Sequence, residues 1–132
     1  MINLCKIDGV VYDALVVALQ EKAEVIEGGN SGEAIYKARE IRDIKGIKYA
    51  HSITFAPNDE HPELFDKLFS YLFDEIHESV MLEVVHNQTT IAYEAAYSTG
   101  SRAVNYINDR AEFVGWDDLT IDFRSREIVV EA

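Results

Sequence analysis

Apolar and polar residues alternate along several stretches of the chain, and this period of two is typical of strands with one buried face. The clearest example is the stretch 47–55, and 119–123 alternates in the same way. Residues 80–85 and 89–96 are predicted as two further strands joined through Asn87-Gln88. The face of 47–55 predicted to be buried carries Ile47, Tyr49, His51, Ile53 and Phe55. For His51 this predicts a place in the core or at an interface.

A helical period separates the first of these strands from the others. Pro62 follows turn-forming and acidic residues, and proline is well tolerated in the first turn of a helix. We therefore predict one amphipathic helix over about 62–77, with His77 as a terminal cation at the negative end of the helix dipole. Its apolar stripe consists of Leu64, Phe65, Leu68, Phe69, Leu72, Phe73 and Ile76.

The N-terminal region contains a turn signal between two apolar segments. Asp8-Gly9 suits the positive φ angles of a tight hairpin turn, so a two-stranded start is predicted. Residues 14–23 are predicted as a strand, although their content of Ala, Leu, Gln, Glu and Lys leaves a helix open. The single cysteine, Cys5, cannot form an intramolecular disulfide and is expected to be a small buried hydrophobe.

Two segments have the character of extensions. Three glycines within five positions, Gly28, Gly29 and Gly32, precede a segment of mixed charge, which predicts a long mobile hairpin or arm over about 27–46. The chain ends with three consecutive β-branched residues inside 125–132. This predicts a C-terminal strand extension that pairs either with the edge of its own domain or with a neighbouring subunit.

The order of these elements is strands, one helix and strands again, without a repeating βαβ unit. It predicts an α+β fold that is predominantly antiparallel β, as a rolled sheet, a sandwich or a barrel, with the helix packed on one face. A chain of 132 residues is the usual size of one domain, so residues 1–132 are expected to fold as a single unit.

The charge balance narrows the range of partners. Asp and Glu number 24 against 12 Lys and Arg, which gives a formal net charge of −12 and an isoelectric point near 4.6. Such a chain repels phosphate backbones, so sequence-specific nucleic acid binding is not expected. No apolar stretch approaches the roughly 18 residues of a membrane span, and the start lacks a signal-peptide pattern. We therefore expect no membrane partner and a chain that is intracellular when made.

The sequence lacks the spacing of known catalytic and metal motifs. The four histidines are 10, 16 and 9 positions apart, without a His-x-x-x-His pair. No Gly-x-Ser-x-Gly motif is present, and the "EGGNSGE" segment has no Gly-Lys-Ser/Thr ending. We therefore expect no enzyme activity, no cofactor and no metal.

Contact with other protein subunits is the remaining prediction. Tyr and Trp combine a large apolar surface with a polar tip, which suits interfaces, although core packing accounts equally well for about half of the aromatic residues. The candidate assembly interface draws on the arm, the aromatic second half and the C-terminal extension. Its members are Ile35, Tyr36, Tyr93, Tyr97, Ile128, Val129 and Val130.

Several segments together resemble a known group of proteins. "HPELFDKLFSYLFDE", "SVMLEVVHNQTTIAYEAAYS" and "GWDDLTIDFRS" are similar to segments of small proteins from the tail modules of bacteriophages and prophages of Gram-positive bacteria. The pattern also resembles the wider tail-tube and distal-tail superfamily. This resemblance implies a rolled antiparallel sandwich with one helix, and an arm at Gly28 to Gly46 that reaches a neighbouring subunit in a ring.

The resemblance also implies a function. It points to a virion structural protein of the tail, as a tube, connector or baseplate-type component, that associates with itself or with other phage tail proteins. It also implies a virion component that is made in the bacterial cytoplasm. Two alternatives stay open on the sequence alone. One is a non-catalytic adaptor that binds a different host or virion protein, and the other is a small-ligand-binding or hydrolytic β-barrel domain.

Overall fold

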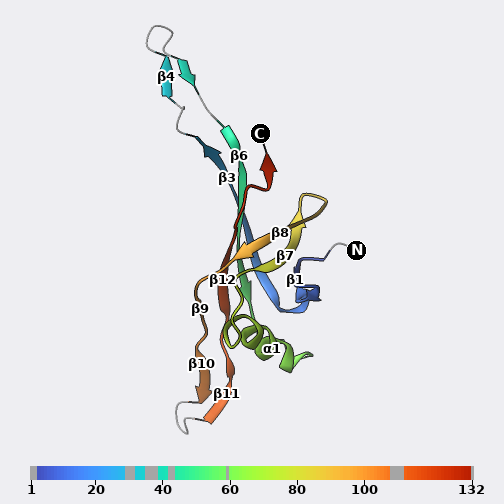
Figure 1. The fold of residues 1–132 in the computed structure, drawn as a ribbon. Coiled ribbons are helices and arrows are strands. Elements are labelled where there is room, and N and C mark those ends of the chain that lie inside the picture. Colours follow the sequence, from blue (N-terminus) through green and yellow to red (C-terminus); the bar gives the residue numbers. More distant parts are fainter. Residues whose placement is uncertain are drawn as a thin grey trace.

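The computed structural model describes residues 3–28, 32–34, 39–41, 44–58, 60–107 and 112–131. Strands dominate this part of the chain, and one α-helix interrupts them (Figure 1). In chain order the elements are β1 (Cys5–Ile7), β2 (Val10–Val11), a 3-10 helix (Asp13–Leu15), β3 (Val16–Glu27), β4 (Gly32–Ala34), β5 (Arg39–Ile41), β6 (Ile44–Phe55), α1 (Pro62–Phe73), β7 (Val80–His86), β8 (Thr89–Ala96), β9 (Gly100–Ser101), β10 (Val104–Ile107), β11 (Glu112–Trp116), β12 (Leu119–Ser125) and β13 (Val130–Glu131).

One antiparallel sheet is built around the long strand β6. Strand β3 pairs with β6 along its whole length, from Val16 opposite Phe55 to Glu27 opposite Ile44. Because β3 occupies one edge of β6, strands β12 and β13 share the other edge. Strand β12 then pairs with β8 and β9, and the sheet continues through β7 and β1 to β2. Two separate strand pairs, β4–β5 and β10–β11, complete the described structure.

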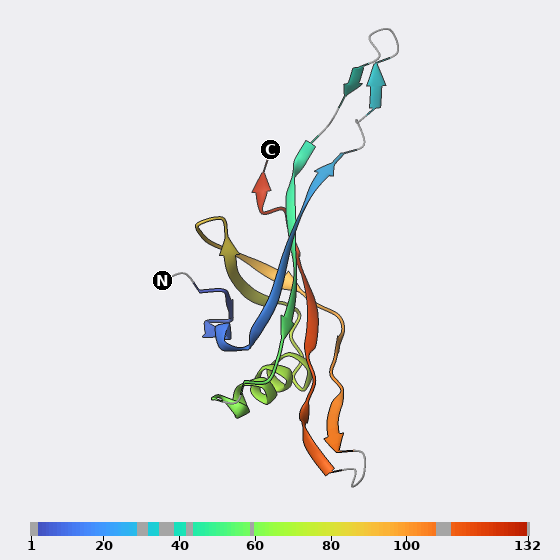
Figure 2. The same cartoon turned by 180° about the vertical axis from the view of Figure 1, so that it is seen from behind.

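The sheet rolls over on itself but stays open. Strand β8 pairs with β12 only through Ala95 and Ala96, and Figures 1 and 2 show β7 and β8 running across β6 and β12. The end of the β7–β8 hairpin reaches back over β6, where the rings of Tyr49 and His86 lie 5.4 Å apart. In the described strands the sheet does not close, since β2 and β3 do not pair with each other. The fold is therefore antiparallel β with one helix, as predicted, but the barrel form of that prediction is wrong.

The helix closes one side of the core. Phe65, Leu68 and Leu72 recur at helical spacing, and each is at most 2% exposed. This confirms the predicted amphipathic stripe in its central part. The inner faces of the strands supply the rest of the core, chiefly through Cys5, Ile7, Ile53, Phe55, Val80, Leu82, Val84, Leu119, Ile121 and Phe123. Burial of Cys5 in this core is also as predicted.

The helix ends earlier than its apolar period predicts. It stops at Phe73, so Ile76 lies beyond it and is fully exposed, and His77 packs its ring against Tyr71 instead of capping the dipole. Both predictions for these residues are wrong. Asp74 and Glu75 explain the early end, because carboxylates are unfavourable at the negative end of a helix. No basic residue lies in the last turn to offset them.

The short-range signals elsewhere are confirmed. Asp8 and Gly9 have φ angles of 47° and 86° in the turn between β1 and β2, and Asn87 has a φ angle of 53° in the β7–β8 turn. Strand β3 begins at Val16 after one turn of 3-10 helix, so the helical alternative for 14–23 is wrong. The alternation in β6 is confirmed where it meets the core, with His51, Ile53 and Phe55 buried.

Strand pairs project from both ends of the core. Figures 1 and 2 show the β3–β6 ribbon leading to β4–β5 at one end, and β9 and β12 leading to β10–β11 at the other. The β4–β5 pair lies within the segment predicted as an arm. In the C-terminal extension, Val130 lies opposite Ile47 of β6, so this strand pairs with its own chain. Gly46 permits this approach, because a Cβ there would lie 2.2 Å from Cγ2 of Ile128.

Candidate functional site

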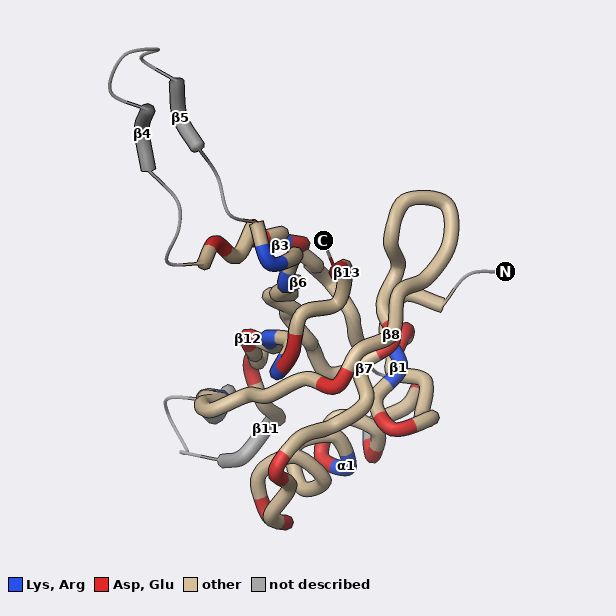
Figure 3. Tube along the Cα trace, turned by 45° about the horizontal axis from the view of Figure 1, so that its top comes forward, with Lys and Arg blue, Asp and Glu red and all other residues tan. Residues whose placement is uncertain are grey.

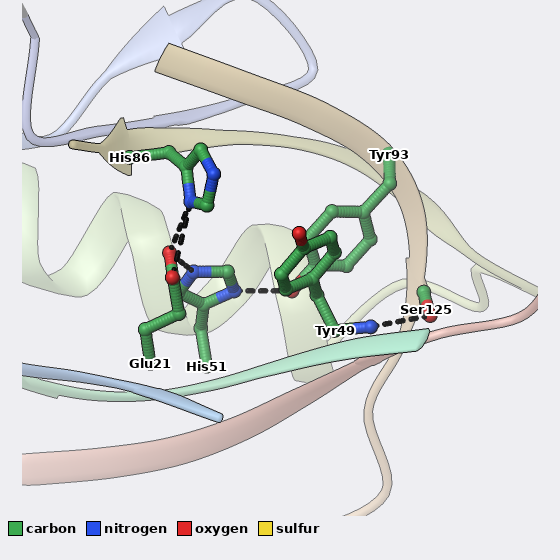
Figure 4. Close-up of polar contacts among 6 residues, drawn as sticks. All are labelled: Glu21, Tyr49, His51, His86, Tyr93 and Ser125. Carbon is green, nitrogen blue, oxygen red and sulfur yellow. Dashed lines mark hydrogen bonds and ion pairs between the residues drawn. The ribbon is translucent and has the colours of Figure 1, made fainter. Parts of the chain in front are cut away.

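Three elements bring polar side chains together under the β7–β8 hairpin (Figure 4). Glu21 of β3 lies directly opposite His51 of β6, so strand register places both on the inner face of the sheet. Tyr93 comes from β8 and His86 from the end of β7, and both point toward this pair. We call Glu21, His51, His86 and Tyr93 the polar cluster.

The contacts of the polar cluster form one continuous chain. Tyr93 Oη lies 2.5 Å from His51 Nδ1, and His51 Nε2 lies 3.0 Å from Glu21 Oε2. His86 Nδ1 lies 2.9 Å and 3.0 Å from the two carboxylate oxygens of Glu21. A neutral His51 protonated on Nε2 satisfies both of its own contacts, because it accepts from the Tyr93 hydroxyl and donates to Glu21.

Burial sets the protonation states of the cluster. Burial lowers the pKa of His51, and this outweighs the opposing effect of the Glu21 carboxylate. Burial also raises the pKa of Tyr93, and the negative charge of Glu21 raises it further. For Glu21, burial acts to raise the pKa, but the hydrogen bonds from His86 and His51 lower it overall. The cluster at neutral pH therefore contains a phenol, a neutral His51 and a carboxylate.

A hydroxyl, an imidazole and a carboxylate in line also occur in nucleophilic enzymes, where the base activates an accessible hydroxyl. Here Tyr93 is 6% exposed and His51 is 1% exposed. His51 also contributes to the lining of a hollow of about 280 Å³, but its neighbours Gln20 and Ser52 have side chains on the opposite face of the sheet. The imidazole therefore points away from this hollow. The arrangement favours a role in fastening β3 and the β7–β8 hairpin to β6.

Further polar groups hold the surrounding strands. Ser125 is buried, and its Oγ accepts a hydrogen bond of 3.2 Å from the backbone N–H of Tyr49. Arg102 lies between two aromatic rings, 3.9 Å from the ring centre of Phe69 and 4.0 Å from that of Trp116. Its guanidinium also lies 2.9 Å from Asp66. These contacts tie the root of the β10–β11 pair to the helix.

The two predicted tyrosines have partners within the chain. Tyr93 belongs to the polar cluster, and Tyr97 is half-buried and donates a hydrogen bond of 2.6 Å to the carbonyl of Leu72. Packing inside this chain therefore accounts for both residues.

The other predicted interface residues belong to the C-terminal extension and to the arm. Val129 packs against the core, Ile128 is half-buried, and Val130 is 43% exposed beside β6. Ile35 and Tyr36 lie outside the described residues. The structure thus places Ile128, Val129 and Val130 beside β6 at the base of the arm, and Ile128 and Val129 line a hollow together with Tyr93. Tyr97 lies elsewhere, against the end of α1.

Sequence reasoning did not identify Glu21 and His86 as members of the cluster. Glu21 lies in a strand whose residues are mostly exposed, and His86 ends a strand, so neither interrupts an apolar pattern. The available signal was His51 on a predicted apolar face, since a buried imidazole requires polar partners. The sequence does not say which residues those partners are.

In the described part of the chain, no group of three or more His, Cys, Asp or Glu side chains is arranged to hold a metal ion. Among the same residues, no helix has the length and apolar character needed to cross a membrane. Comparison with known proteins found no family model and no curated sequence that matches the chain.

Proposed function

We propose that this chain is a non-catalytic structural protein of a phage or prophage tail that acts by assembling with copies of itself or with other tail proteins. The observation that carries the proposal is the long β3–β6 ribbon, which extends from the core and continues into β4–β5 (Figure 2). A protein that acts alone gains nothing from such a projection, whereas a subunit that must reach its neighbour does.

The exposed residues at the base of the ribbon support an assembly role. Val25 and Val130 lie on either side of Ile47 in one cross-strand row, and they are 41% and 43% exposed. Ile44, close by on β6, is also 41% exposed. A neighbouring subunit that covers this row would remove apolar surface from water, which is the main driving force of protein association.

The charge distribution fits a tail component. Asp and Glu positions are spread over the core in Figure 3, and the formal net charge of the chain is −12. A wall of like charge would let DNA pass without adhering. On this proposal the chain is made in the bacterial cytoplasm and becomes part of the virion, with other tail proteins as its partners. A tube, connector or baseplate-type component is equally compatible with these features.

The test compares oligomeric state with and without the arm. Light scattering after size-exclusion chromatography should show an oligomer whose mass rises with protein concentration. Deletion of residues 31–43 should weaken that association while circular dichroism stays that of an antiparallel sheet. A control that replaces the same residues with an equally long Gly-Ser segment separates the role of the arm's side chains from the role of its length. A monomer at all concentrations that also binds no tail protein would refute the proposal.

A second function, an adaptor that binds a different protein, rests on another surface. Leu4, Val11 and Met81 lie on the outer face of the sheet around the Lys6–Glu83 ion pair, and they are 41% to 50% exposed. A partner specific to this apolar surface would copurify with the monomer and would be lost in a Val11→Glu/Met81→Glu variant. Loss of self-association in the same variant would instead assign this surface to the first function.

A further inference from the structure

Strand β3 has one edge that no described strand covers. It pairs with β6 on one side from Val16 to Glu27, with Val17 outside the register, and no second strand pairs with it in the described part of the sheet. The pairing is regular from Ala18 to Ile26, between two register shifts. Long regular edges with open N–H and C=O groups are the sites at which sheets add a further strand.

The charges along β3 limit which strand can pair with its free edge. Gln20, Lys22 and Glu24 lie on the outer face of the sheet, opposite Ser52, Ala50 and Lys48 of β6, and Glu21, Ala23 and Val25 lie on the inner face. In a two-fold antiparallel pair of β3 strands, residues directly opposite each other share a face. Only registers that pair outer residues with outer residues therefore continue the sheet across the two copies.

Among these registers, only one gives a long overlap of the two β3 strands without opposing like charges. Centring the pair on Lys22 opposes two lysines, and centring it on Glu21 or on Glu24 opposes two glutamates, all of which are destabilising. Centring it on Ala23 instead places Lys22 opposite Glu24 of the second copy, and this favourable pair occurs twice. All positions from Gln20 to Ile26 then pair within the regular stretch of β3.

We propose that the free edge of β3 binds β3 of a second copy of this chain, antiparallel and centred on Ala23. Lys22 of each copy then joins Glu24 of the other, in a row that continues to Lys48 on β6. This inference rests on the proposed self-association and adds its partner strand and register. This contact is two-fold, because the same strand of both copies takes part. A contact in which the arm reaches a different patch of a neighbour is heterologous, and both kinds of contact can occur in one assembly.

Charge reversal tests the register. Lys22→Glu places glutamates opposite each other on both sides of the central Ala23, and we expect the dissociation constant from sedimentation equilibrium to rise on the order of tenfold. Glu24→Lys should weaken association similarly, and the double variant should restore it to about the wild-type value. Lys67→Glu, which makes the same change of charge at an exposed position of α1, serves as the matched control and should leave association unchanged.

Cysteine cross-linking tests the geometry independently. Ala23→Cys should form a disulfide-linked dimer under mild oxidation, because the two copies of residue 23 face each other, while Gln20→Cys should not. The native Cys5 is buried and serves as an internal control. A dissociation constant that Lys22→Glu leaves unchanged, or a dimer cross-linked through residue 20, would overturn this register but leave the proposed function standing. A strictly monomeric wild type, or one whose β3 edge binds only a different protein, would overturn the inference as well.

Discussion

Removal of the Tyr93 hydroxyl is the sharpest test of the polar cluster. Tyr93→Phe keeps the ring and its packing but leaves Nδ1 of His51 without its hydrogen-bond partner in a site that is 1% exposed. A buried polar atom without a partner costs about 1 to 3 kcal/mol. In a chain of 132 residues, each kcal/mol lowers the melting temperature by about 3 to 5 °C. We therefore expect a decrease of about 6 to 10 °C at the middle of that range.

A double-mutant cycle separates the hydrogen bond from general effects of the substitutions. Replacing both partners, as His51→Phe with Tyr93→Phe, should cost less than the sum of the single variants, because neither leaves the other unpaired. The coupling free energy from urea unfolding should lie in the range of about 0.5 to 3 kcal/mol. Protein concentration must be the same for all variants, since self-association also stabilises the folded state.

Tyr97→Phe provides the matched control. It also removes a hydroxyl, but this hydroxyl donates to the carbonyl of Leu72 and has no contact with His51. Its effect should therefore add to that of His51→Phe within about 0.5 kcal/mol. If the Tyr93 cycle is equally additive, or if Tyr93→Phe leaves stability unchanged, then the polar cluster does not fasten β8 to β6.

Three further predictions concern pH and packing. The pKa of both His51 and Glu21 is lowered in the folded chain, so the unfolded chain binds more protons at low pH. The free energy of unfolding should therefore fall as pH drops below about 6.5, and again below about 4.3. His51→Phe should reduce the loss of stability below pH 6.5. Gly46→Ala should lower the free energy of unfolding by about 1 to 3 kcal/mol and make the C-terminal strand accessible to proteases. Gly115→Ala is the control and should leave stability unchanged, because no atom lies within 4 Å of the added Cβ. Leu68→Ala should lower the free energy of unfolding in urea by about 2 to 5 kcal/mol. Leu68→Asp should abolish the near-UV circular dichroism spectrum of the folded chain. A native spectrum for Leu68→Asp would contradict the assigned core.

Local patterns were enough to predict most elements of this chain. The alternation in 47–55 and 119–123 and the turns at Asp8-Gly9 and Asn87-Gln88 all appear in the structure. Each of these features depends on a few consecutive residues, through the period of the backbone or the φ angle that a turn requires. The helix was found by its period, but its end was placed four residues too late, because apolar spacing alone takes no account of the acidic pair after Phe73.

The antiparallel β class, the single helix and the buried face of each main strand thus follow from the sequence by itself, since they depend on contacts between near neighbours. Only the tertiary structure decided that the sheet stays open and that Glu21 meets His51 and His86, which are 30 and 65 positions away in the chain. Such contacts arise from strand order and curvature, in which many distant pairings compete, and no local period specifies the outcome. For the same reason Tyr93, which the sequence offers as an interface residue, lies in the core beside His51.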